Sequence, residues 1–271
     1  MSRQLRKLRR DGFCVVRGLL SPARVTAVNE SIHRTIRDQL KYLGAPSPAP
    51  DLHAALRTLH ATDLGRYRQT VAALWRKAEV SGLMHHPRLF EFMREALGWE
   101  DVFLPGGDVV FIMAADLEIP GGYFGLDAHQ DFPSVQGSLD ALVAWIPLSD
   151  VDRRGYPIEL VAGSHRRGLI TEVDETATGW NIRAEQLLQA KWQPIVVSAG
   201  DVVFMSVFTI HRSVLIADPG RLRIALSTRF DNAAEPTFIA RAYPTAYKRQ
   251  VHRDQYVPDF PTAEQIRQLF D

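Results

Sequence analysis

Two histidines and one aspartate near the middle of the chain have the types and the spacing of a metal site. His129 and Asp131 are separated by one residue, and His211 follows 80 residues after Asp131. Two imidazoles and one carboxylate form the facial triad that binds non-heme Fe(II) and leaves coordination positions open. On a β-strand, residues i and i+2 point to the same face, so His129 and Asp131 could bind one metal ion together. His-x-Asp alone arises often by chance, so the surrounding sequence has to support this interpretation.

The bulk composition is that of a globular protein of one or two domains. The 271 residues are 46% hydrophobic and 23% charged, with a net charge of +1, which gives no field that favours nucleic acid or an anionic membrane. No apolar run approaches the ~20 residues that span a bilayer. The single cysteine, Cys14, excludes a disulfide within this chain. We therefore expect a cytoplasmic protein without a nucleic-acid or membrane partner, and the sequence is silent on the oligomeric state.

Hydrophobic patterning divides the chain into a helical first part and a strand-rich second part. Apolar residues recur at helical spacing from Val25 to Leu40, after a Ser-Pro pair that can cap and begin a helix. Further helices are expected from Leu52 and from Pro87. Beyond residue 100, apolar or alternating runs separated by turn residues predict strands. These runs cover residues 109–113, 141–146, 195–197, 202–210 and 221–230.

Helices first and strands after indicate a mainly β (α+β) fold. We expect a double-stranded β-helix, that is a jelly-roll or cupin-like barrel, with the N-terminal helices packed outside. No repeat, low-complexity tract or linker marks a domain boundary. The sequence therefore predicts a single domain over residues 1–271, with a helical part to about residue 100, a jelly-roll core over about 101–240 and a C-terminal tail over 241–271.

Several segments, taken in order, resemble the phytanoyl-CoA dioxygenase family of Fe(II)- and 2-oxoglutarate-dependent oxygenases. The resemblance covers nearly the whole chain, and as an ordered set its motifs are specific. The segments are Arg10-Asp-Gly-Phe-Cys-Val-Val-Arg-Gly-Leu-Leu-Ser21, His129-Gln130-Asp131, Ala144-Trp-Ile-Pro-Leu148, Ala162-Gly-Ser-His165, Gly200-Asp201, His211-Arg212-Ser213 and Arg223-Ile-Ala-Leu-Ser-Thr-Arg-Phe230.

The resemblance implies a role for each matching residue. His129, Asp131 and His211 match the family's iron ligands. Arg223 matches the arginine that pairs with the far carboxylate of 2-oxoglutarate, Ser213 matches a helper hydroxyl, and Trp145 matches an aromatic residue beside the co-substrate, although tryptophan in such a strand is also a normal core residue. Arginine suits this position because its planar fork binds a carboxylate through two parallel hydrogen bonds.

The position of the co-substrate arginine leaves two candidates. The family usually places it eleven residues after the second histidine, whereas Arg223 comes twelve and Arg221 ten residues after His211. The flanking Arg-x-Ala-Leu-Ser pattern favours Arg223. Both residues fall on the same face of the predicted strand, so alternation does not separate them. Arg229 continues that polar face, where an ion pair at the rim of the barrel is the simplest interpretation.

The reaction implied by the resemblance uses Fe(II), 2-oxoglutarate and O2. It oxidises an unactivated C–H bond of a small-molecule metabolite, with hydroxylation as the default outcome, and it releases succinate and CO2. Desaturation, ring closure and epimerisation stay open. Relatives that halogenate lack the carboxylate ligand, so the presence of Asp131 argues against halogenation.

Substrate contacts are expected from loops around the mouth of the barrel. The glycine-rich loop over residues 121–127 contains Phe124 and could act as a lid, Gln136 could offer a polar contact, and the segment over residues 168–192, with Trp180, could cover the opening. Without a basic groove, nothing favours a CoA-type anionic substrate. A small metabolite, such as a polar natural-product or sugar-like intermediate, is the expected class.

Two other functions are compatible with the same ligand set. A cupin-like metalloenzyme could use zinc for isomerisation or hydrolysis, but this hypothesis leaves Arg223 and Ser213 unexplained. A non-catalytic metabolite-binding barrel would fit an incomplete triad, whereas the triad is complete here.

Overall fold

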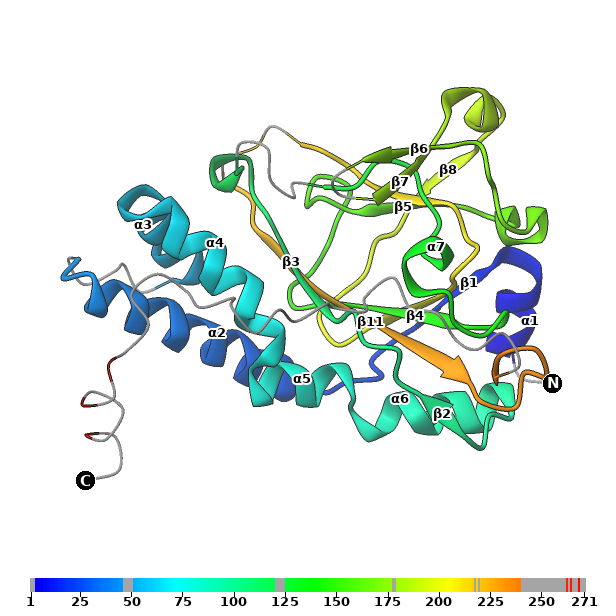
Figure 1. Ribbon diagram of the computed structural model, residues 1–271, viewed down its shortest axis with the longest axis horizontal. Helices are drawn as coiled ribbons and strands as arrows, with labels where there is room; N and C mark the ends of the chain where they lie inside the picture. The colour runs from blue at the N-terminus through cyan, green and yellow to red at the C-terminus, as the bar shows by residue number, and fades with distance from the viewer. Residues whose placement is uncertain are drawn as a thin grey trace.

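Helices occupy the first part of the chain and strands the second, and the two parts pack against each other (Figure 1). The structure is a computed structural model that describes residues 3–45, 51–119, 125–176, 179–216, 218, 220–239, 262, 264 and 268. Within these residues, no helix is long and apolar enough to cross a membrane. Most of the predicted tail over 241–271 and residues 121–124 of the predicted lid, which include Phe124, lie outside the described residues.

The N-terminal helices begin at residues whose side chains satisfy free backbone N–H groups. The Ser21 side chain accepts a hydrogen bond from the Arg24 N–H, and the Asp51 side chain accepts one from the Ala54 N–H, as N-caps do. The predicted helices from Val25, Leu52 and Pro87 are confirmed, whereas α4 and α5 were not predicted. The helices are α1 (Arg3–Asp11), α2 (Pro22–Tyr42), α3 (Leu52–Thr62), α4 (Leu64–Ala73) with the 3₁₀ turn η1 (Leu74–Arg76), α5 (Ala78–Met84), α6 (Pro87–Phe92) with a π-helical turn (Met93–Leu97), and the short α7 (Phe132–Val135).

The strands form a large curled antiparallel sheet and a smaller one that faces it. The larger sheet has six strands in the order β1-β9-β4-β11-β2, with β3 also paired to β11. The smaller sheet has the order β10-β5-β8, and β6 and β7 form a separate hairpin. The strands are β1 (Phe13–Val16), β2 (Val102–Phe103), β3 (Val109–Met113), β4 (Leu142–Pro147), β5 (Ile158–Val161), β6 (Val173–Thr176), β7 (Gly179–Ile182), β8 (Trp192–Pro194), β9 (Val202–Ser206), β10 (His211–Ser213) and β11 (Arg223–Asn232).

The period of two along each strand divides the apolar residues between two cores. On β4, Leu142, Ala144 and Ile146 pack against the helices, whereas Val143 and Trp145 pack in the core between the two sheets. Each face of the larger sheet is thus covered, by helices on one side and by the smaller sheet on the other. The predicted fold, a jelly-roll barrel with helices outside, is confirmed.

Strand β11 confirms the predicted alternation and shows where its polar face points. Ile224 and Leu226 belong to the core shared with the helices, whereas Ala225 packs between the sheets. Arg223 and Arg229, on the same face as Ala225, are therefore turned into the barrel, where they are 1% and 6% exposed. A buried guanidinium is costly unless it is paired, so this strand needs acceptors inside the barrel.

Two predicted strands differ from the structure. The run over 195–197 contributes only an isolated bridge between Val151 and Val197. The run over 202–210 ends as β9 at Ser206, because Ser206 accepts hydrogen bonds from the N–H groups of Phe208, through its hydroxyl, and of Thr209, through its carbonyl. Such a local turn competes with strand pairing. His211 consequently begins a new strand in the other sheet and does not end β9.

Candidate metal centre

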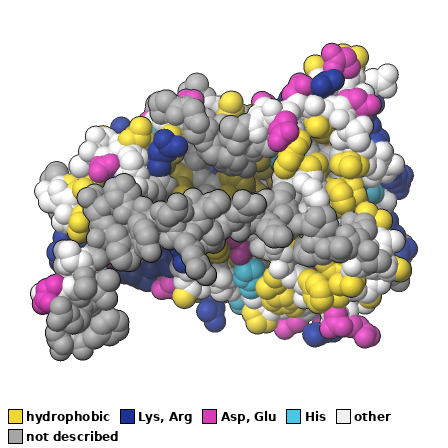
Figure 2. Space-filling view, viewed as in Figure 1, with side chains coloured by type: hydrophobic (Ala, Val, Ile, Leu, Met, Phe, Trp, Pro, Cys, Tyr) yellow, Lys and Arg dark blue, Asp and Glu magenta, His cyan; other side chains and the backbone are white. Residues whose placement is uncertain are grey.

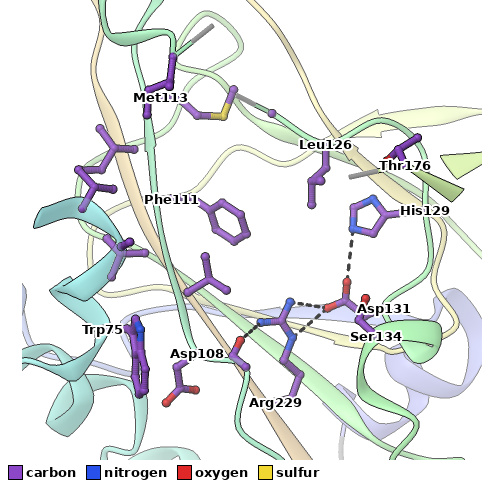
Figure 3. Close-up of a pocket in the computed structure, with 18 of the residues that line it drawn as sticks. Trp75, Asp108, Phe111, Met113, Leu126, His129, Asp131, Ser134, Thr176 and Arg229 are labelled. Atoms are coloured by element: carbon purple, nitrogen blue, oxygen red, sulfur yellow. Dashed lines mark hydrogen bonds and ion pairs between the residues drawn. The ribbon is translucent and has the colours of Figure 1, made fainter. Parts of the chain in front are cut away.

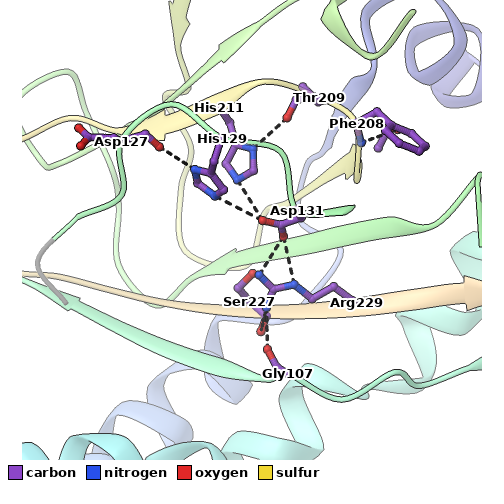
Figure 4. A network of polar contacts seen from close by, with 10 residues as sticks. Gly107, Asp127, His129, Asp131, Phe208, Thr209, His211, Ser227 and Arg229 are labelled. Atoms are coloured by element: carbon purple, nitrogen blue, oxygen red, sulfur yellow. Dashed lines mark hydrogen bonds and ion pairs between the residues drawn. The ribbon is translucent and has the colours of Figure 1, made fainter. Parts of the chain in front are cut away.

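The three residues of the predicted triad meet inside the barrel. One ligand atom from each of His129, Asp131 and His211 lies within 4.8 Å of the others, and all three residues are buried. The Asp131 Oδ1 atom lies 3.3 Å from Nε2 of His129 and 3.7 Å from Nε2 of His211 (Figure 4). The arrangement is a compact cluster of two nitrogens and one oxygen, which are the donor types of a facial triad.

Two local backbone features bring the ligands together. The N–H of His129 donates to the carbonyl of His211 at 3.0 Å, and the N–H of His211 donates back at 3.1 Å, so the two histidines form an isolated antiparallel bridge. Asp131 has φ −78° and ψ −22° and precedes α7. The premise that Asp131 lies on a strand is therefore wrong, because a helical turn directs its carboxylate toward the two imidazoles.

The ring orientation of both histidines is fixed by backbone carbonyls. Nδ1 of His129 lies 2.7 Å from the carbonyl oxygen of Asp127, and Nδ1 of His211 lies 3.0 Å from that of Thr209. A carbonyl oxygen only accepts, so each Nδ1 carries a proton, and Nε2 is the ring nitrogen that each histidine turns toward the centre. Both rings are thus prepared to coordinate a metal ion through Nε2.

The protonation states also suit a divalent cation. Burial alone would raise the pKa of Asp131, but the charge of Arg229, together with His129 and His211, holds that pKa well below its usual range. Burial, reinforced by the neighbouring His129, lowers the pKa of His211 to about 4. The carboxylate is therefore ionised and His211 is neutral at neutral pH, so the residues fit a bound metal.

Arg229 is the functional residue that the sequence interpretation missed. It does not lie at the rim, because its side chain is only 7% exposed, and it donates from Nη2 at 2.8 Å and from Nε at 3.1 Å to Oδ2 of Asp131. Its Nη1 atom donates to the Gly107 carbonyl at 2.7 Å. The alternation of β11 already placed Arg229 on the inward face of that strand, but alternation alone does not identify the residue with which Arg229 pairs.

Gln130, between the two ligands, points away from the centre and holds the segments around it. Its amide nitrogen donates to the carbonyls of Gly168 and Phe208 at 2.8 and 2.7 Å, and its amide oxygen accepts from the Ile170 N–H at 2.9 Å. One side chain therefore connects the metal-binding tripeptide with the segment before β10 and the one before β6.

Two of the predicted co-substrate residues, Arg223 and Trp145, lie together inside the barrel, and Ser213 follows His211 by two residues on β10. Arg223 donates from Nη1 to the Tyr156 carbonyl at 2.8 Å and from Nη2 to the Met113 sulfur at 2.6 Å. Its guanidinium carbon lies 5.5 Å from the centroid of a Trp145 ring. A Cβ atom added at Gly125 would lie 3.4 Å from Ser213 Cβ and 3.5 Å from Met113 Cε. Met113 therefore contacts Arg223 directly, and both its Cε atom and the Cβ atom of Ser213 lie near Gly125.

Arg221 takes a different position. Its side chain is 43% exposed, and it forms ion pairs with Asp152 at 3.4 Å and with Asp218 at 3.8 Å. The structure therefore distinguishes the two candidates for the co-substrate arginine, because Arg223 lies inside the barrel and Arg221 lies on its surface.

A cavity of about 940 Å³ opens beside the triad, and His129, Asp131 and Arg229 form one end of it (Figure 3). Among the predicted substrate residues, Trp180 lines this cavity. Gln136 is not part of the described lining, and its amide nitrogen donates to the Pro133 carbonyl at 3.2 Å. The sequence interpretation did not foresee that α4 and η1 supply one wall, because that depends on tertiary packing.

The sequence profile of the phytanoyl-CoA dioxygenase (PhyH) family matches residues 8–215, a range that contains all three triad residues. The chain belongs to the phytanoyl-CoA dioxygenase family. Membership confirms the resemblance seen in the sequence, and Fe(II), 2-oxoglutarate and O2 are the cofactors that go with this family and its triad. No curated protein matches the chain significantly.

Solved structures of other enzymes share the fold of this PhyH-family chain. The non-heme alpha ketoglutarate dependent carbocyclase SnoK from nogalamycin biosynthesis has a TM-score of 0.59 and 18% identity, covering 86% of this chain and 85% of SnoK. The epimerase SnoN in complex with Fe3+, alpha ketoglutarate and nogalamycin RO has a TM-score of 0.58 and 18% identity, covering 96% and 92%. EctD from S. alaskensis in its apoform has a TM-score of 0.51 and 17% identity, covering 87% and 78%. At these identities the likeness is one of fold.

Proposed function

We propose that this PhyH-family protein is an Fe(II)- and 2-oxoglutarate-dependent dioxygenase that hydroxylates an unactivated C–H bond of a small-molecule metabolite. One atom of O2 enters the substrate and the other enters succinate, which forms from 2-oxoglutarate with loss of CO2. The observation that carries the proposal is the buried cluster of His129, Asp131 and His211, whose ligand atoms lie within 4.8 Å of one another. When bound, iron would supply the oxidative chemistry that no protein side chain provides.

The residues of the triad would hold the metal through one atom each. The Nδ1 protons of His129 and His211 are committed to carbonyl oxygens, so only Nε2 is available. The Oδ2 atom of Asp131 accepts from Arg229, so Oδ1 is left for the metal. Three ligands that each bind through one atom would leave coordination positions for a chelating co-substrate and for oxygen. Bidentate binding by the carboxylate would leave fewer such positions.

Arg223 would bind the far carboxylate of 2-oxoglutarate. Its guanidinium is buried, lies over Trp145 and already donates to the Tyr156 carbonyl and to the Met113 sulfur. A thioether is a weak acceptor, whereas a carboxylate forms charge-assisted hydrogen bonds that are about twice as strong as neutral ones. The carboxylate would therefore displace Met113 from Nη2, and the Ser213 hydroxyl is the second donor that the family resemblance implies.

The presence of Asp131 as a third ligand supports oxidation without halogenation, because it fills the position that a chloride would need. Epimerisation and ring closure, the activities named for SnoN and SnoK, use the same fold. We propose hydroxylation as the simplest outcome that the triad and the open cavity allow.

Anaerobic addition of Fe(II) and 2-oxoglutarate tests the proposal directly. The wild-type protein should develop the weak visible charge-transfer band of the chelate, and admission of oxygen should convert 2-oxoglutarate to succinate. Asp131→Ala should lose the band, whereas Asp174→Ala, which changes a surface carboxylate that is 65% exposed, should keep it. A folded wild-type protein with neither band nor succinate would refute the oxygenase and favour a non-redox metal protein.

A further inference from the structure

The cavity beside the triad is large for the expected small polar substrate. Its volume of about 940 Å³ lies near the upper end of the ~300–1,000 Å³ that ligand pockets usually span. Hydrophobic side chains, in yellow, lie inside a hollow near the centre of the face in Figure 2. If the proposed function holds, this cavity binds the molecule that is oxidised, so the size, polarity and charge of its lining indicate what kind of molecule that is.

One wall of the cavity is a helical face that would ordinarily be exposed to water. Arg68, Val71, Ala72 and Trp75 of α4 and η1 line it, and their i, i+3, i+4, i+7 spacing places them on one side of the helix. The opposite side, with Thr70 and Leu74, is buried. Val71 and Trp75 are only half-buried, so two large apolar side chains remain partly uncovered at this wall.

Strand β3 supplies a second apolar wall. Val110 and Ile112 pack into the core with the helices, so Val109, Phe111 and Met113 face the other way by alternation. All three line the cavity, and Val109 and Phe111 are half-buried. Figure 3 shows the Phe111 ring in the space between β3 and the Leu126–His129 segment. Partly uncovered apolar and aromatic surface inside a cavity favours a ligand with matching apolar surface.

Charges around the cavity do not suit a nucleotide-linked substrate. Among its described lining residues, the cations are Arg68 and Arg229, and Arg229 is committed to Asp131. Polar groups gather instead at the β6–β7 hairpin, where Glu175, Thr176 and Asn181 line the opening. One remaining arginine, Arg68, in a lining that also contains Glu175, provides little for the several phosphates of a coenzyme thioester.

We propose that the substrate is a bulky, ring-containing and largely apolar molecule without phosphate groups. Its rings lie against Val71, Trp75 and Phe111, and its polar substituents face the β6–β7 hairpin. Aromatic side chains favour offset-stacked or edge-to-face contacts with rings, and the same body reaches Leu126 and the triad at the inner end. This replaces the sugar-like intermediate expected from the sequence with a more apolar class, and it identifies α4 and η1 as determinants of specificity.

Equilibrium dialysis with two radiolabelled probes tests the inference. Estradiol, a four-ring alcohol, should bind the wild-type protein loaded with Fe(II) and 2-oxoglutarate under anaerobic conditions, whereas L-proline, a compact zwitterion, should not. Ala72→Trp fills the cavity and should weaken estradiol binding by about tenfold or more. Ala73→Trp is the matched control, because Ala73 is also exposed but lies outside the described lining, and it should change the affinity less than about twofold.

Two results would overturn the inference: binding of L-proline in preference to estradiol, or equal effects of Ala72→Trp and Ala73→Trp. Both tryptophan variants should keep the visible band of the Fe(II) and 2-oxoglutarate chelate, which shows that the metal centre is intact. Failure of the proposed function gives a different result, because the wild type would then show no visible band. Estradiol binding by the wild type, and its loss in Ala72→Trp, would still test the inference about the cavity.

Discussion

The two carboxylate oxygens of Asp131 have separate partners, and Arg229 makes the division. Oδ1 faces Nε2 of both His129 and His211, whereas Oδ2 accepts from Nη2 of Arg229 at 2.8 Å. The same guanidinium donates to the Gly107 carbonyl, next to the start of β3. Arg229 therefore sets the orientation of one metal ligand and connects it to the wall of the cavity. It is a positioning residue, since it acts through Asp131.

Replacement of Arg229 should weaken metal binding. Arg229→Leu should lower the affinity for Co(II), measured from its visible absorption, by about 10–100-fold, the usual effect of removing a partner of a metal ligand. Arg229→Lys keeps the charge but loses the fork, so its effect should be intermediate. Melting curves without metal show whether each variant folds.

The matched control for Arg229 is a surface arginine. Arg88 pairs with Glu91 at 3.2 Å, and its side chain is 59% exposed. Arg88→Leu should leave the Co(II) affinity unchanged, because exposed ion pairs contribute little. If the Arg229→Lys and Arg229→Leu variants both fold and both bind Co(II) normally, Asp131 does not need Arg229 to bind the metal.

Arg223 and Arg221 should differ sharply in their effect on 2-oxoglutarate. Removal of a buried charge-assisted anchor costs about 2–3 kcal/mol, so Arg223→Ala should raise the Kd of 2-oxoglutarate by about 30–150-fold. Arg221→Ala should change it little, because Arg221 is exposed and paired with Asp152 and Asp218. Anaerobic titration of the visible band measures both, with Arg223→Lys as a variant that retains the charge. The reverse ranking would move the co-substrate site to the surface arginine.

Met113 should compete with 2-oxoglutarate for the Arg223 guanidinium. Its sulfur accepts from Nη2 at 2.6 Å, and Met113→Leu removes that acceptor at nearly constant volume. Loss of a weak hydrogen bond of about 0.5–1 kcal/mol should lower the Kd of 2-oxoglutarate by about 2–5-fold. Met205→Leu, in the core between the sheets, is the control. Weaker 2-oxoglutarate binding in Met113→Leu alone would mean that the sulfur helps to orient the arginine.

Local patterns predicted most of the elements, because each element depends on residues close in sequence, whereas the triad joins His129 and Asp131 to the distant His211 and was predicted from the ordered motifs of the family resemblance. The alternation on β11 separated Leu226 from Arg229, and the spacing from Val25 to Leu40 predicted α2. What alternation does not encode is the partner across the barrel. Arg229 meets a carboxylate 98 residues earlier in the chain, and Trp75 reaches the cavity only because α4 packs beside β3, so neither role was predictable.

The Gly200-Asp201 motif was recognised from the family resemblance, and the structure gives the physical reason for both residues. Gly200 has φ +93°, and a Cβ atom there would clash with the Leu20 carbonyl oxygen, so only glycine fits. Asp201 accepts from the N–H groups of Gly18 and Ser198 at 2.9 and 2.8 Å and pairs with Arg17. Both reasons depend on the approach of the segment after β1 to the segment before β9.

Asp201→Asn should destabilise the protein in a pH-dependent manner. Burial alone would raise the pKa of Asp201, but hydrogen bonds from Ser198, Gly18 and Arg17 lower it. A lowered pKa stabilises the fold above the ordinary Asp value of about 3.9, and this contribution disappears as the pH falls through the folded-state pKa. We expect a loss of about 2 kcal/mol at neutral pH, measured by urea unfolding. The gap to wild type should shrink below about pH 4, and a gap that widens there would contradict the assignment.

Gln130 should be more sensitive to a charged replacement than to an apolar one. Its amide nitrogen donates to the carbonyls of Gly168 and Phe208, so the carboxylate of Gln130→Glu would place negative charge against two acceptors in a site that is 3% exposed. Gln130→Leu only leaves backbone groups unpaired, at a cost of about 1–3 kcal/mol, whereas the buried charge should cost more. Urea unfolding at neutral pH ranks the two variants, and Co(II) titration shows whether His129 and Asp131 lose their alignment. If Gln130→Glu were as stable as wild type, the amide would not be what holds these segments around the metal ligands.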